Sequence, residues 1–243
     1  MIIDTHCHID LYDNPMEIAK ESERLDIITI GMTNLPSHFE LGKPHLRGFK
    51  KVRLALGMHP LYAEKHLLEL PIFFRNIDNT SYIGEIGLDF SMEGISTREI
   101  QIENFTQILK VLKGKKKILS IHSRMAEREV LNLLTENNVK NVIFHWYSGS
   151  LKIIDEIIKN NFYFSINPAM VRTKSGRAII KNIPLANILT ESDGPFVSVD
   201  NKLIMPKDIY LVHQYLAEVH ECTTNAISEK ISDNFSFLIK QIS

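Results

Sequence analysis

Two histidines separated by one residue, His6 and His8, follow the first apolar stretch of the chain, Met1–Thr5. On an extended strand, residues i and i+2 face the same side, so both imidazoles can reach one ion. Neutral imidazole is a preferred ligand of zinc and similar divalent metals. A single pair of this kind is weak evidence, because histidines also occur at strand ends without a metal.

Four further residues of metal-binding types each close or follow another apolar run. They are Glu85, His122, His145 and Asp193, after runs that begin at Tyr82, Ile118, Val142 and Ile188. If these runs are the strands of a parallel barrel, their carboxyl ends converge on the rim where catalytic residues of this architecture lie. One such residue is better explained as a hydrogen-bonded core group, but six on one rim indicate a metal site.

Four imidazoles and two carboxylates are enough to hold two divalent ions, with one carboxylate bridging them. Such a centre activates a water molecule and stabilises oxygens that gain charge during a displacement. The chemistry suits hydrolysis of phosphodiesters, amides or lactones, and the ligand types do not choose among these. Imidazole ligands favour Zn²⁺ or Mn²⁺, whereas Mg²⁺ prefers oxygen ligands, so the metal stays open among the three.

The alternation of short apolar runs with amphipathic stretches predicts the elements that position these residues. The predicted strands are Met1–Thr5, Ile27–Gly31, Val52–Leu56, Tyr82–Glu85, Ile118–Ile121, Val142–Phe144, Phe162–Ile166 and Ile188–Thr190. The predicted helices are Met16–Leu25, Ser37–Gly48, Lys65–Asn79, Ser96–Leu112, Arg124–Asn137, Leu151–Asn160, Lys174–Lys181, Lys207–Glu221 and Thr224–Ile242. Ser96 and Glu99 are expected to form a capping box. Eight βα repeats in 243 residues, without a break in composition, predict one α/β domain over residues 1–243, a (β/α)₈ barrel.

The composition excludes several classes of protein. Hydrophobic residues make up 44% of the chain and charged residues 23%, as in ordinary globular proteins, and the net charge of −1 gives no global attraction to polyanions. Two cysteines, Cys7 and Cys222, are too few for a disulfide framework. The start of the chain does not resemble a leader, and no apolar run approaches the roughly 18 residues of a membrane span. We therefore expect a cytoplasmic enzyme without a membrane partner.

Local features suggest how a polyanion could be held near the rim. Basic residues on the predicted βα loops are Lys43, His45, Arg124, Arg172, Lys174 and Arg177. Arg124 is the best placed, because its planar guanidinium can grip a phosphate beside His122. The basic run Lys113–Lys117 is expected on the opposite face. Trp146 should point away from His145, where it could stack a base or pack against a helix, and Asp89 could orient a ligand.

Six segments in the same order resemble the TatD family of metal-dependent deoxyribonucleases and span nearly the whole chain. They are DTHCHID (4–10), GMHP (57–60), IGEIGLD (83–89), IHSR (121–124), HWYSG (145–149) and LTESDGPF (189–196). The resemblance implies an amidohydrolase-like, metal-dependent TIM barrel with a dinuclear site. It also implies hydrolysis of DNA phosphodiester bonds, commonly from a chain end.

Carried over residue by residue, the resemblance implies the ligands of each ion. One metal ion would be bound by His6, His8, Glu85 and Asp193, and the other by Glu85, His122 and His145. Glu85 would bridge, and Asp193 would orient or deprotonate the attacking water. His59, Ser123 and Arg124 resemble phosphate-contacting residues. Two departures are Ser192, where the family usually has threonine, and a shortened segment between Pro195 and Pro206 that lacks the family's Asn-containing stretch.

A narrower resemblance suggests a biological role. PSHFE (36–40), GEIGLDFS (84–91), FHWYSG (144–149) and SINPAM (165–170) are similar to the TatD-like subunit of Qat anti-phage defence systems, which implies protein partners. Two alternatives stay open: an amidohydrolase-like enzyme that cleaves C–N or ester bonds, and a metal-stabilised subunit active only within a defence complex. The chain has no obvious strand-end lysine for carbamylation, and Glu85 fills that place, which favours the nuclease.

Overall fold

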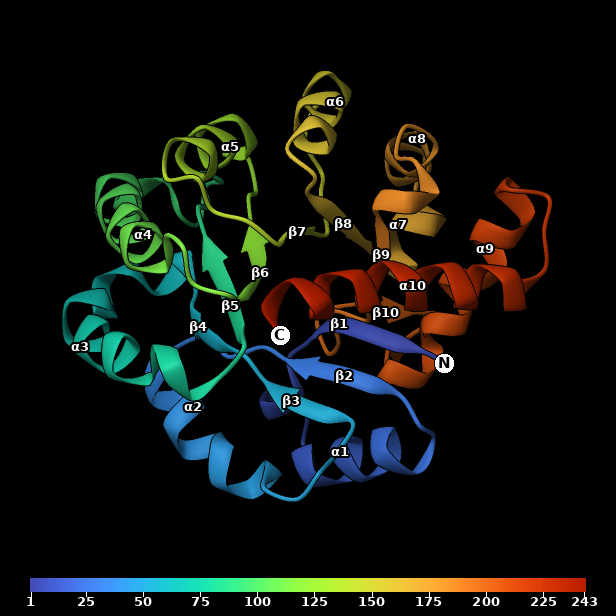
Figure 1. Ribbon diagram of the computed structural model, residues 1–243, viewed down its shortest axis with the longest axis horizontal. Helices are drawn as coiled ribbons and strands as arrows, with labels where there is room; N and C mark the ends of the chain where they lie inside the picture. The colour runs from blue at the N-terminus through green and yellow to red at the C-terminus, as the bar shows by residue number, and fades with distance from the viewer.

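The computed structural model describes residues 1–243, and its main strands form a parallel barrel (Figure 1). The barrel strands are β1 (Ile3–Cys7), β2 (Ile28–Gly31), β3 (Val52–Leu54), β4 (Leu56–Met58), β5 (Tyr82–Gly87), β6 (Ile118–His122), β7 (Val142–His145), β8 (Tyr163–Ile166) and β9 (Ile188–Thr190). They pair in the orders β1-β2-β3 and β4-β5-β6-β7-β8-β9. β3 and β4 are halves of one strand interrupted at Ala55, whose N–H donates to the Gly31 carbonyl at 2.8 Å. The barrel therefore has the eight predicted strands.

The last strand returns to the first and closes the barrel. Thr190 Oγ1 donates to the Ile3 carbonyl at 2.6 Å, and Thr5 Oγ1 donates to the Thr190 carbonyl at 3.0 Å. Beyond β9, the Asp193 N–H donates to the His6 carbonyl at 2.9 Å. These bonds join residues that are 185 or more positions apart, and they place Asp193 beside His6 on β1 and His8 just after it.

Helices surround the barrel in the predicted alternation. The α-helices are α1 (Pro15–Arg24), α2 (Pro36–Gly42), α3 (His66–Asn76), α4 (Arg98–Leu112), α5 (Glu127–Glu136), α6 (Leu151–Lys159), α7 (Pro168–Arg172), α8 (Lys174–Lys181), α9 (Tyr210–Val219) and α10 (Thr224–Ile242). Short 3₁₀ turns are η1 (Ile9–Leu11), η2 (Lys43–Leu46), η3 (Pro60–Lys65), η4 (Ile77–Asn79), η5 (Ile95–Thr97), η6 (Leu185–Asn187) and η7 (Pro206–Ile209). No helix is both long and apolar enough to cross a membrane.

Three local features differ from the sequence prediction. The capping box is wrong: Ser96 lies inside η5, and Thr97 precedes α4 without a side-chain cap. Gln101, within α4, ties the helix to the preceding turn, because its Nε2 donates to the Gly94 carbonyl at 2.8 Å. The short helix α7 and the hairpin β10 (Ser198–Val199)–β11 (Lys202–Leu203) were not predicted. Both lie on the stretches that follow β8 and β9.

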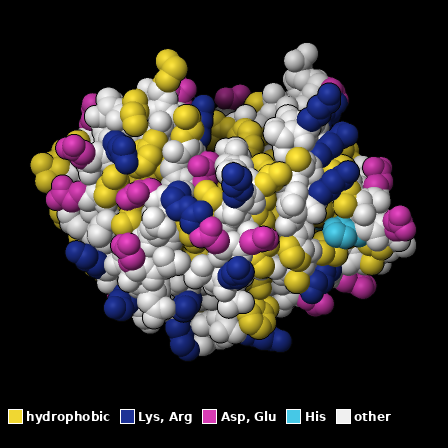
Figure 2. Space-filling view, turned by 90° about the horizontal axis from the view of Figure 1, so that it is seen from above, with side chains coloured by type: hydrophobic (Ala, Val, Ile, Leu, Met, Phe, Trp, Pro, Cys, Tyr) yellow, Lys and Arg dark blue, Asp and Glu magenta, His cyan; other side chains and the backbone are white.

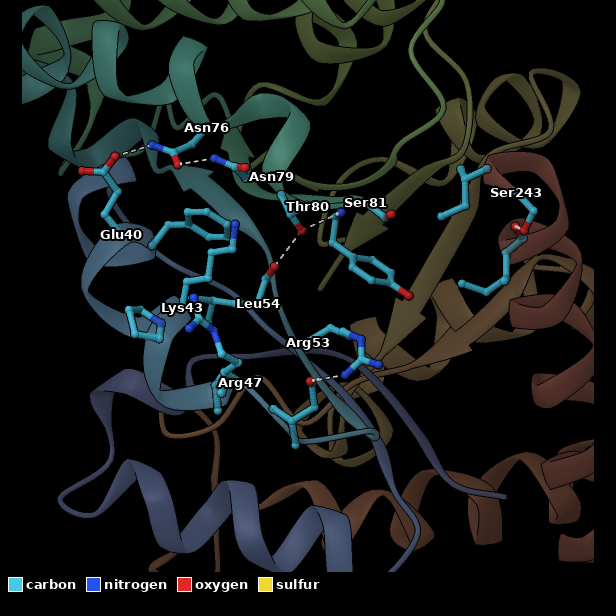
Figure 3. A pocket seen from close by; sticks show the side chains of 17 residues that line it. Glu40, Lys43, Arg47, Arg53, Leu54, Asn76, Asn79, Thr80, Ser81 and Ser243 are labelled. Carbon is cyan, nitrogen blue, oxygen red and sulfur yellow. Dashed lines mark hydrogen bonds between the residues drawn. The ribbon is translucent and has the colours of Figure 1, made fainter.

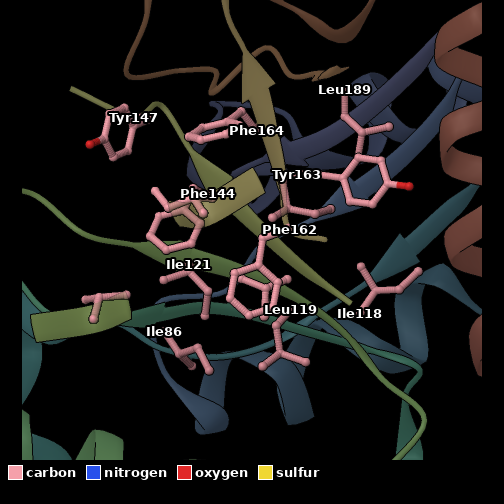
Figure 4. Close-up of a cluster of buried hydrophobic side chains, with 14 of the residues drawn as sticks. Ile86, Ile118, Leu119, Ile121, Phe144, Tyr147, Phe162, Tyr163, Phe164 and Leu189 are labelled. Atoms are coloured by element: carbon pink, nitrogen blue, oxygen red, sulfur yellow. The ribbon is translucent and has the colours of Figure 1, made fainter. Parts of the chain in front are cut away.

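The apolar core lies outside and beneath the strands (Figure 4). On β6, Ser120 and His122 point to the barrel interior. Because side chains alternate along a strand, their neighbours Leu119 and Ile121 point outward to the helices. α10 crosses one end of the barrel (Figure 1), and its buried Phe235 lies with Thr5 and Ile143 inside it. That end is closed by apolar packing, which leaves the carboxyl end of the strands for polar side chains.

The exposed surface shows no field of one sign on the face that carries α6 and α8. Lysine and arginine side chains are interspersed there with aspartate and glutamate (Figure 2). The basic run Lys113–Lys117 lies before β6 at the amino-terminal end of the barrel, as predicted. Lys115 pairs with Asp78 at 2.9 Å, and Lys117 Nζ donates to the Thr80 carbonyl at 2.6 Å. This run therefore stabilises the closed end of the barrel.

Candidate metal centre

The structure brings the side chains of all six predicted metal ligands together at the carboxyl end of the barrel. They are His6 on β1, His8 after it, Glu85 on β5, His122 on β6, His145 on β7 and Asp193 after β9. Each is largely withdrawn from water, with the His122 side chain the most accessible at 14% exposure. Six residues of distant sequence positions thus form one buried polar cluster.

Glu85 lies at the centre of the cluster, and its two oxygens face different imidazoles. Oε2 is 3.1 Å from His8 Nε2 and 3.5 Å from His6 Nε2. Oε1 is 2.6 Å from His122 Nδ1 and 2.8 Å from His145 Nε2. One carboxylate therefore connects two pairs of nitrogen atoms, which is the arrangement that a bridging ligand requires.

Asp193 completes the side of the cluster formed by the first two histidines. Its Oδ1 lies 3.6 Å from His6 Nε2 and 3.9 Å from His8 Nε2. This oxygen is buried and has no hydrogen-bond donor in the protein. His6, His8 and Asp193 present one ligand atom each within 4.8 Å of one another, and His6, Glu85 and His145 do the same.

Neighbouring side chains orient the imidazoles. Ser120 Oγ is 2.7 Å from His6 Nδ1, and Asp89 Oδ2 is 2.8 Å from His122 Nε2. Each contact occupies the ring nitrogen that points away from the centre, so the other nitrogen is directed at Glu85 or Asp193. Asp89 thus lies where the sequence suggested an orienting residue. Ser120 was not predicted, although its spacing of two from His122 places it on the same side of β6.

Charges within the cluster shift its proton equilibria in opposite directions. Burial opposes protonation of His145, but the carboxylates of Glu85 and Glu191 outweigh it and raise the pKa of His145 well above its ordinary value. Burial would likewise raise the pKa of Glu85, but the neighbouring His59, His145 and His122 hold that pKa well below its ordinary value. Glu85 is therefore an anion that the surrounding imidazoles stabilise.

Asp193 has the opposite balance. Burial raises the pKa of this carboxyl well above its ordinary value, and the nearby charges of Glu191, Glu85 and Asp4 add to the effect, although His145 opposes them. A buried carboxylate without a donor, aimed at imidazole nitrogens, lacks a cation. Divalent metals supply that charge and invert the local pKa balance. The donor set of four imidazoles and two carboxylates therefore fits divalent ions.

Removal of divalent metal is expected to lower the melting temperature of the protein. Ions that bind only the folded chain stabilise it by about 4 kcal/mol at a thousand times their dissociation constant. Differential scanning fluorimetry after chelation and dialysis, followed by titration with Zn²⁺, Mn²⁺ or Mg²⁺, measures this effect. A melting temperature unchanged by chelation, with no metal detected by mass spectrometry before it, would contradict the metal centre.

Glu191 is a buried carboxylate of the site to which the sequence prediction gave no role. It accepts hydrogen bonds from the Trp146 N–H at 3.0 Å, from Asn167 Nδ2 at 2.9 Å and from the Ser165 hydroxyl. Its Oε1 also lies 3.7 Å from His145 Nδ1. Its spacing of two from Asp193 was an available signal, because it places both acids near the same side of the extended chain. Glu191 joins the ends of β7, β8 and β9.

Replacement of Glu191 by alanine is expected to destabilise the protein by roughly 3–5 kcal/mol, because several buried donors lose their acceptor. Urea unfolding followed by circular dichroism measures this change. Glu136→Ala, at an exposed position on α5, is the matched control and should change stability by less than about 0.5 kcal/mol. Equal effects of the two variants would show that the network around Glu191 does not stabilise the fold.

A pocket of about 760 Å³ opens above the cluster and includes the predicted phosphate-contacting residues His59, Ser123 and Arg124. His59 Nδ1 accepts the Leu61 N–H at 3.1 Å, so its proton lies on Nε2, which is 3.3 Å from Glu85 Oε1. His59 thus presents an N–H donor to the pocket. Arg124 Nη1 lies 3.2 Å from the exposed carboxylate of Glu93.

The other basic residues proposed for this rim lie elsewhere. Of the six, only Arg124 lines the pocket above the cluster. Arg172 pairs with Asp200 of the unpredicted hairpin at 3.0 Å, and Arg177 Nε donates to the Val171 carbonyl at 2.6 Å. Lys43 and His45 belong to η2 on the outside of the barrel. Apart from Arg124, these residues do not line the pocket above the cluster, and their role in holding a polyanion stays a prediction.

Trp146 also departs from its predicted orientation. It lines the same pocket as His145 and packs partly against the apolar core. In β7 successive side chains point to opposite faces, but Trp146 has a φ of 35° and is no longer part of the strand. Its side chain therefore does not point to the face opposite His145. The indole therefore combines a packed edge with a surface that faces the pocket.

Comparisons with known proteins agree with this geometry. Residues 3–240 match the family model described as TatD related DNase. Human deoxyribonuclease TATDN3 is 26% identical over 256 residues, covering 96% of this chain and 92% of the human protein. The uncharacterized metal-dependent hydrolase YabD of Bacillus subtilis is 26% identical and covers 99% of both chains. The crystal structure of YJJV, a TatD homolog from Escherichia coli, superimposes with a TM-score of 0.87 at 22% identity, over 98% of this chain and 97% of that one. This similarity confirms the barrel fold.

Proposed function

Because the chain belongs to the TatD-related DNase family and is a metal-dependent hydrolase, we propose that it hydrolyses phosphodiester bonds of DNA at two divalent metal ions. In this proposal residues 1–243 form one hydrolase domain. His6, His8, Glu85 and Asp193 hold one ion, and Glu85, His122 and His145 hold the other. The observation that carries the proposal is the position of Glu85, whose two oxygens face two different pairs of imidazoles.

The residues of the chain have distinct tasks in the reaction. Bound ions would supply Lewis acidity to a phosphoryl group and acidity to a water molecule. Asp193 Oδ1, which has no donor in the protein, takes a proton from the attacking water. His59 donates its Nε2–H to a phosphoryl oxygen, and Ser123 and Arg124 hold the neighbouring phosphate. The burial of Glu85 and Asp193 withdraws these carboxylates from bulk water and strengthens their contacts, whereas the Arg124 side chain is half exposed.

The alternative of C–N or ester bond cleavage has weaker support. No lysine lines the pocket above the metal cluster, and Glu85 occupies its centre. Among the relatives, TATDN3 is named a deoxyribonuclease. DNA is therefore the substrate that we propose.

Hydrolysis of end-labelled single-stranded and duplex DNA tests the proposed function. Protein freed of metal by chelation is resupplied with Mg²⁺, Mn²⁺ or Zn²⁺, and products are separated by electrophoresis. We expect cleavage only when metal is present. A protein that binds two ions but cleaves neither DNA form with any metal would overturn the stand-alone nuclease and favour a subunit that needs partners or a different substrate.

We further propose that the protein acts in the cytoplasm, together with protein partners, in defence against phage. This proposal rests on the similarity of segments 36–40, 84–91, 144–149 and 165–170 to the TatD-like subunit of Qat systems. The plating efficiency of phage on cells that carry the native gene cluster, with wild-type protein or with Asp193→Asn, tests it. Equal plating on both strains would exclude a defence role for the metal centre.

A further inference from the structure

A second large pocket, of about 800 Å³, is lined by the first residues of β3 and β5, Val52 and Tyr82, whereas the metal cluster lies at the carboxyl end of the barrel. Figure 3 shows this pocket. It is bounded by α2 and η2, by β3, by the residues that lead into β5, and by the end of α10. It shares no residue with the pocket above the metal ions. The proposed nuclease reaction gives this space no task.

Three exposed cationic side chains line this pocket: Lys43 and Arg47 at η2, and Arg53 on β3, apart from the other two (Figure 3). Lys43 and Arg47 have no acidic or hydrogen-bonding partner in the protein, and Lys43 Nζ lies 5.6 Å from the Phe39 ring centre. Arg53 is anchored through Nη1, which donates to the Phe49 carbonyl at 2.6 Å and to the Val52 carbonyl at 2.9 Å. Its Nε and Nη2 make no bond within the protein. The pocket thus contains fixed and free cationic donors.

The one acidic side chain that lines the pocket, Glu40, is already paired. Arg75 donates to both carboxylate oxygens of Glu40, at 2.9 and 2.7 Å, and Asn76 Nδ2 donates to Oε1 at 2.6 Å. These bonds lower the pKa of Glu40 to about 2. The Ser243 backbone oxygen likewise accepts a hydrogen bond from Lys116 Nζ at 2.6 Å. The cations that face the pocket therefore lack a counter-charge that the protein could supply.

The rest of the lining suits a ligand larger than a simple ion. Leu54, Ile239 and Ile242 give the pocket apolar walls, and the Tyr82 ring lies among them. Neither the Ser81 hydroxyl, which is labelled in Figure 3, nor the Tyr82 hydroxyl has a partner in the protein, so both can donate. Pockets for small organic ligands measure about 300–1,000 Å³, and this pocket falls within that range.

We propose that this pocket binds a small organic phosphate of nucleotide size, with the phosphate on Lys43 and Arg47 and with Arg53 beside the organic part. Arginine forks match the geometry of phosphate oxygens, and Lys43 adds a second positive charge. The organic part would pack between Leu54 and the end of α10. The proposal is independent of the nuclease reaction, because the two pockets have no residue in common.

Isothermal titration calorimetry at fixed ionic strength tests the proposal with adenosine 5′-monophosphate, adenosine and inorganic phosphate. The full-length protein is used in wild-type form and as Glu85→Gln, Arg47→Glu and Arg98→Ala. We expect adenosine 5′-monophosphate to bind wild type and Glu85→Gln alike, and at least about tenfold more tightly than adenosine or phosphate. Arg47→Glu should weaken this binding at least about tenfold, since Arg47 supports no contact of the fold. The matched control is Arg98→Ala on α4, which removes a guanidinium 4.6 Å from the Phe90 ring. This variant should bind adenosine 5′-monophosphate as the wild type does.

Three results would overturn this assignment. If the nucleotide bound Arg47→Glu as tightly as wild type, its phosphate could not be bound at the basic side of the pocket. Loss of binding in Glu85→Gln would show that the ligand binds at the metal centre and not in this pocket. If inorganic phosphate bound as tightly as the nucleotide, the organic part of the ligand would have no role in recognition. Circular dichroism of each variant separates lost binding from lost folding. None of these results depends on whether the protein cleaves DNA.

Discussion

Replacement of Glu85 by glutamine is expected to reduce DNA cleavage by about 10²–10³-fold, a loss of the size seen when a charge-stabilising group of an active site is removed. The variant keeps the size of the side chain but removes its charge. A carboxamide has one acceptor oxygen, so it cannot face both imidazole pairs as an acceptor. We therefore also expect the bound metal to fall from two ions to one or fewer. Initial rates on labelled DNA and metal analysis by mass spectrometry measure the two effects.

Glu93→Gln is the matched control for this prediction. Glu93 lines the same pocket, but its side chain is 65% exposed and pairs only with Arg124. An exposed ion pair contributes at most about 1 kcal/mol, so the rate should change less than about fivefold. A Glu85→Gln variant that keeps both ions and the wild-type rate would show that Glu85 is not the bridging ligand.

The barrel could be predicted from the sequence because its signals are redundant. Each strand is a short apolar run and each helix an amphipathic one, and an error of a few residues at a boundary does not change the topology. The interruption of one strand at Ala55 does not disturb the prediction either, since β3 and β4 together occupy one predicted run. Local features had no such redundancy. The predicted capping box at Ser96 fails because Ser96 lies inside the 3₁₀ turn η5, and Thr97 is the residue that precedes α4.

The clustering of the six side chains predicted to bind metal could be foreseen for a similar reason. The carboxyl ends of the strands of a parallel barrel meet at one rim, so residues at these ends are expected to lie close together whatever the details of the loops. The orienting partners Ser120 and Glu191 depend on which side chains meet across the barrel, which spacing alone defines only in part. The unpredicted hairpin also gives Arg172 an ion-pair partner, Asp200, that the sequence did not suggest. Loop geometry depends on tertiary contacts, and the periodicity of hydrophobic residues in the sequence does not predict these contacts.

Replacement of Asp193 by asparagine is expected to reduce cleavage by about 10²–10⁴-fold, the contribution of a general base. In the proposed mechanism asparagine still fills the space and can accept a hydrogen bond, but it cannot take a proton from water. Circular dichroism should show an unchanged fold. Asp155→Asn, at an exposed position on α6, serves as the control and should keep the wild-type rate.

Although Asp193→Asn is expected to lower the cleavage rate, it is expected to raise the stability of the metal-free protein. Burial raises the pKa of Asp193 well above its ordinary value of 3.8, and the charges of Glu191, Glu85 and Asp4 add to the shift. The folded state then binds a proton that the unfolded state has released, so this carboxyl costs stability increasingly as the pH rises above about 4. Asparagine removes that cost, and the metal-free variant should melt at a higher temperature than wild type, by a larger margin at about pH 8 than at about pH 5.

Added metal should reverse this order, because a cation bound beside Asp193 turns the unfavourable charge into an attraction that asparagine cannot supply. Melting curves of wild type and Asp193→Asn, with and without Zn²⁺ or Mn²⁺ at both pH values, measure the reversal. A metal-free variant less stable than wild type at the higher pH would contradict the charge balance inferred for Asp193. Equal stabilisation of both proteins by metal would contradict its role as a ligand. Loss of cleavage together with the reversal would assign both the ligand and the base function to one carboxylate.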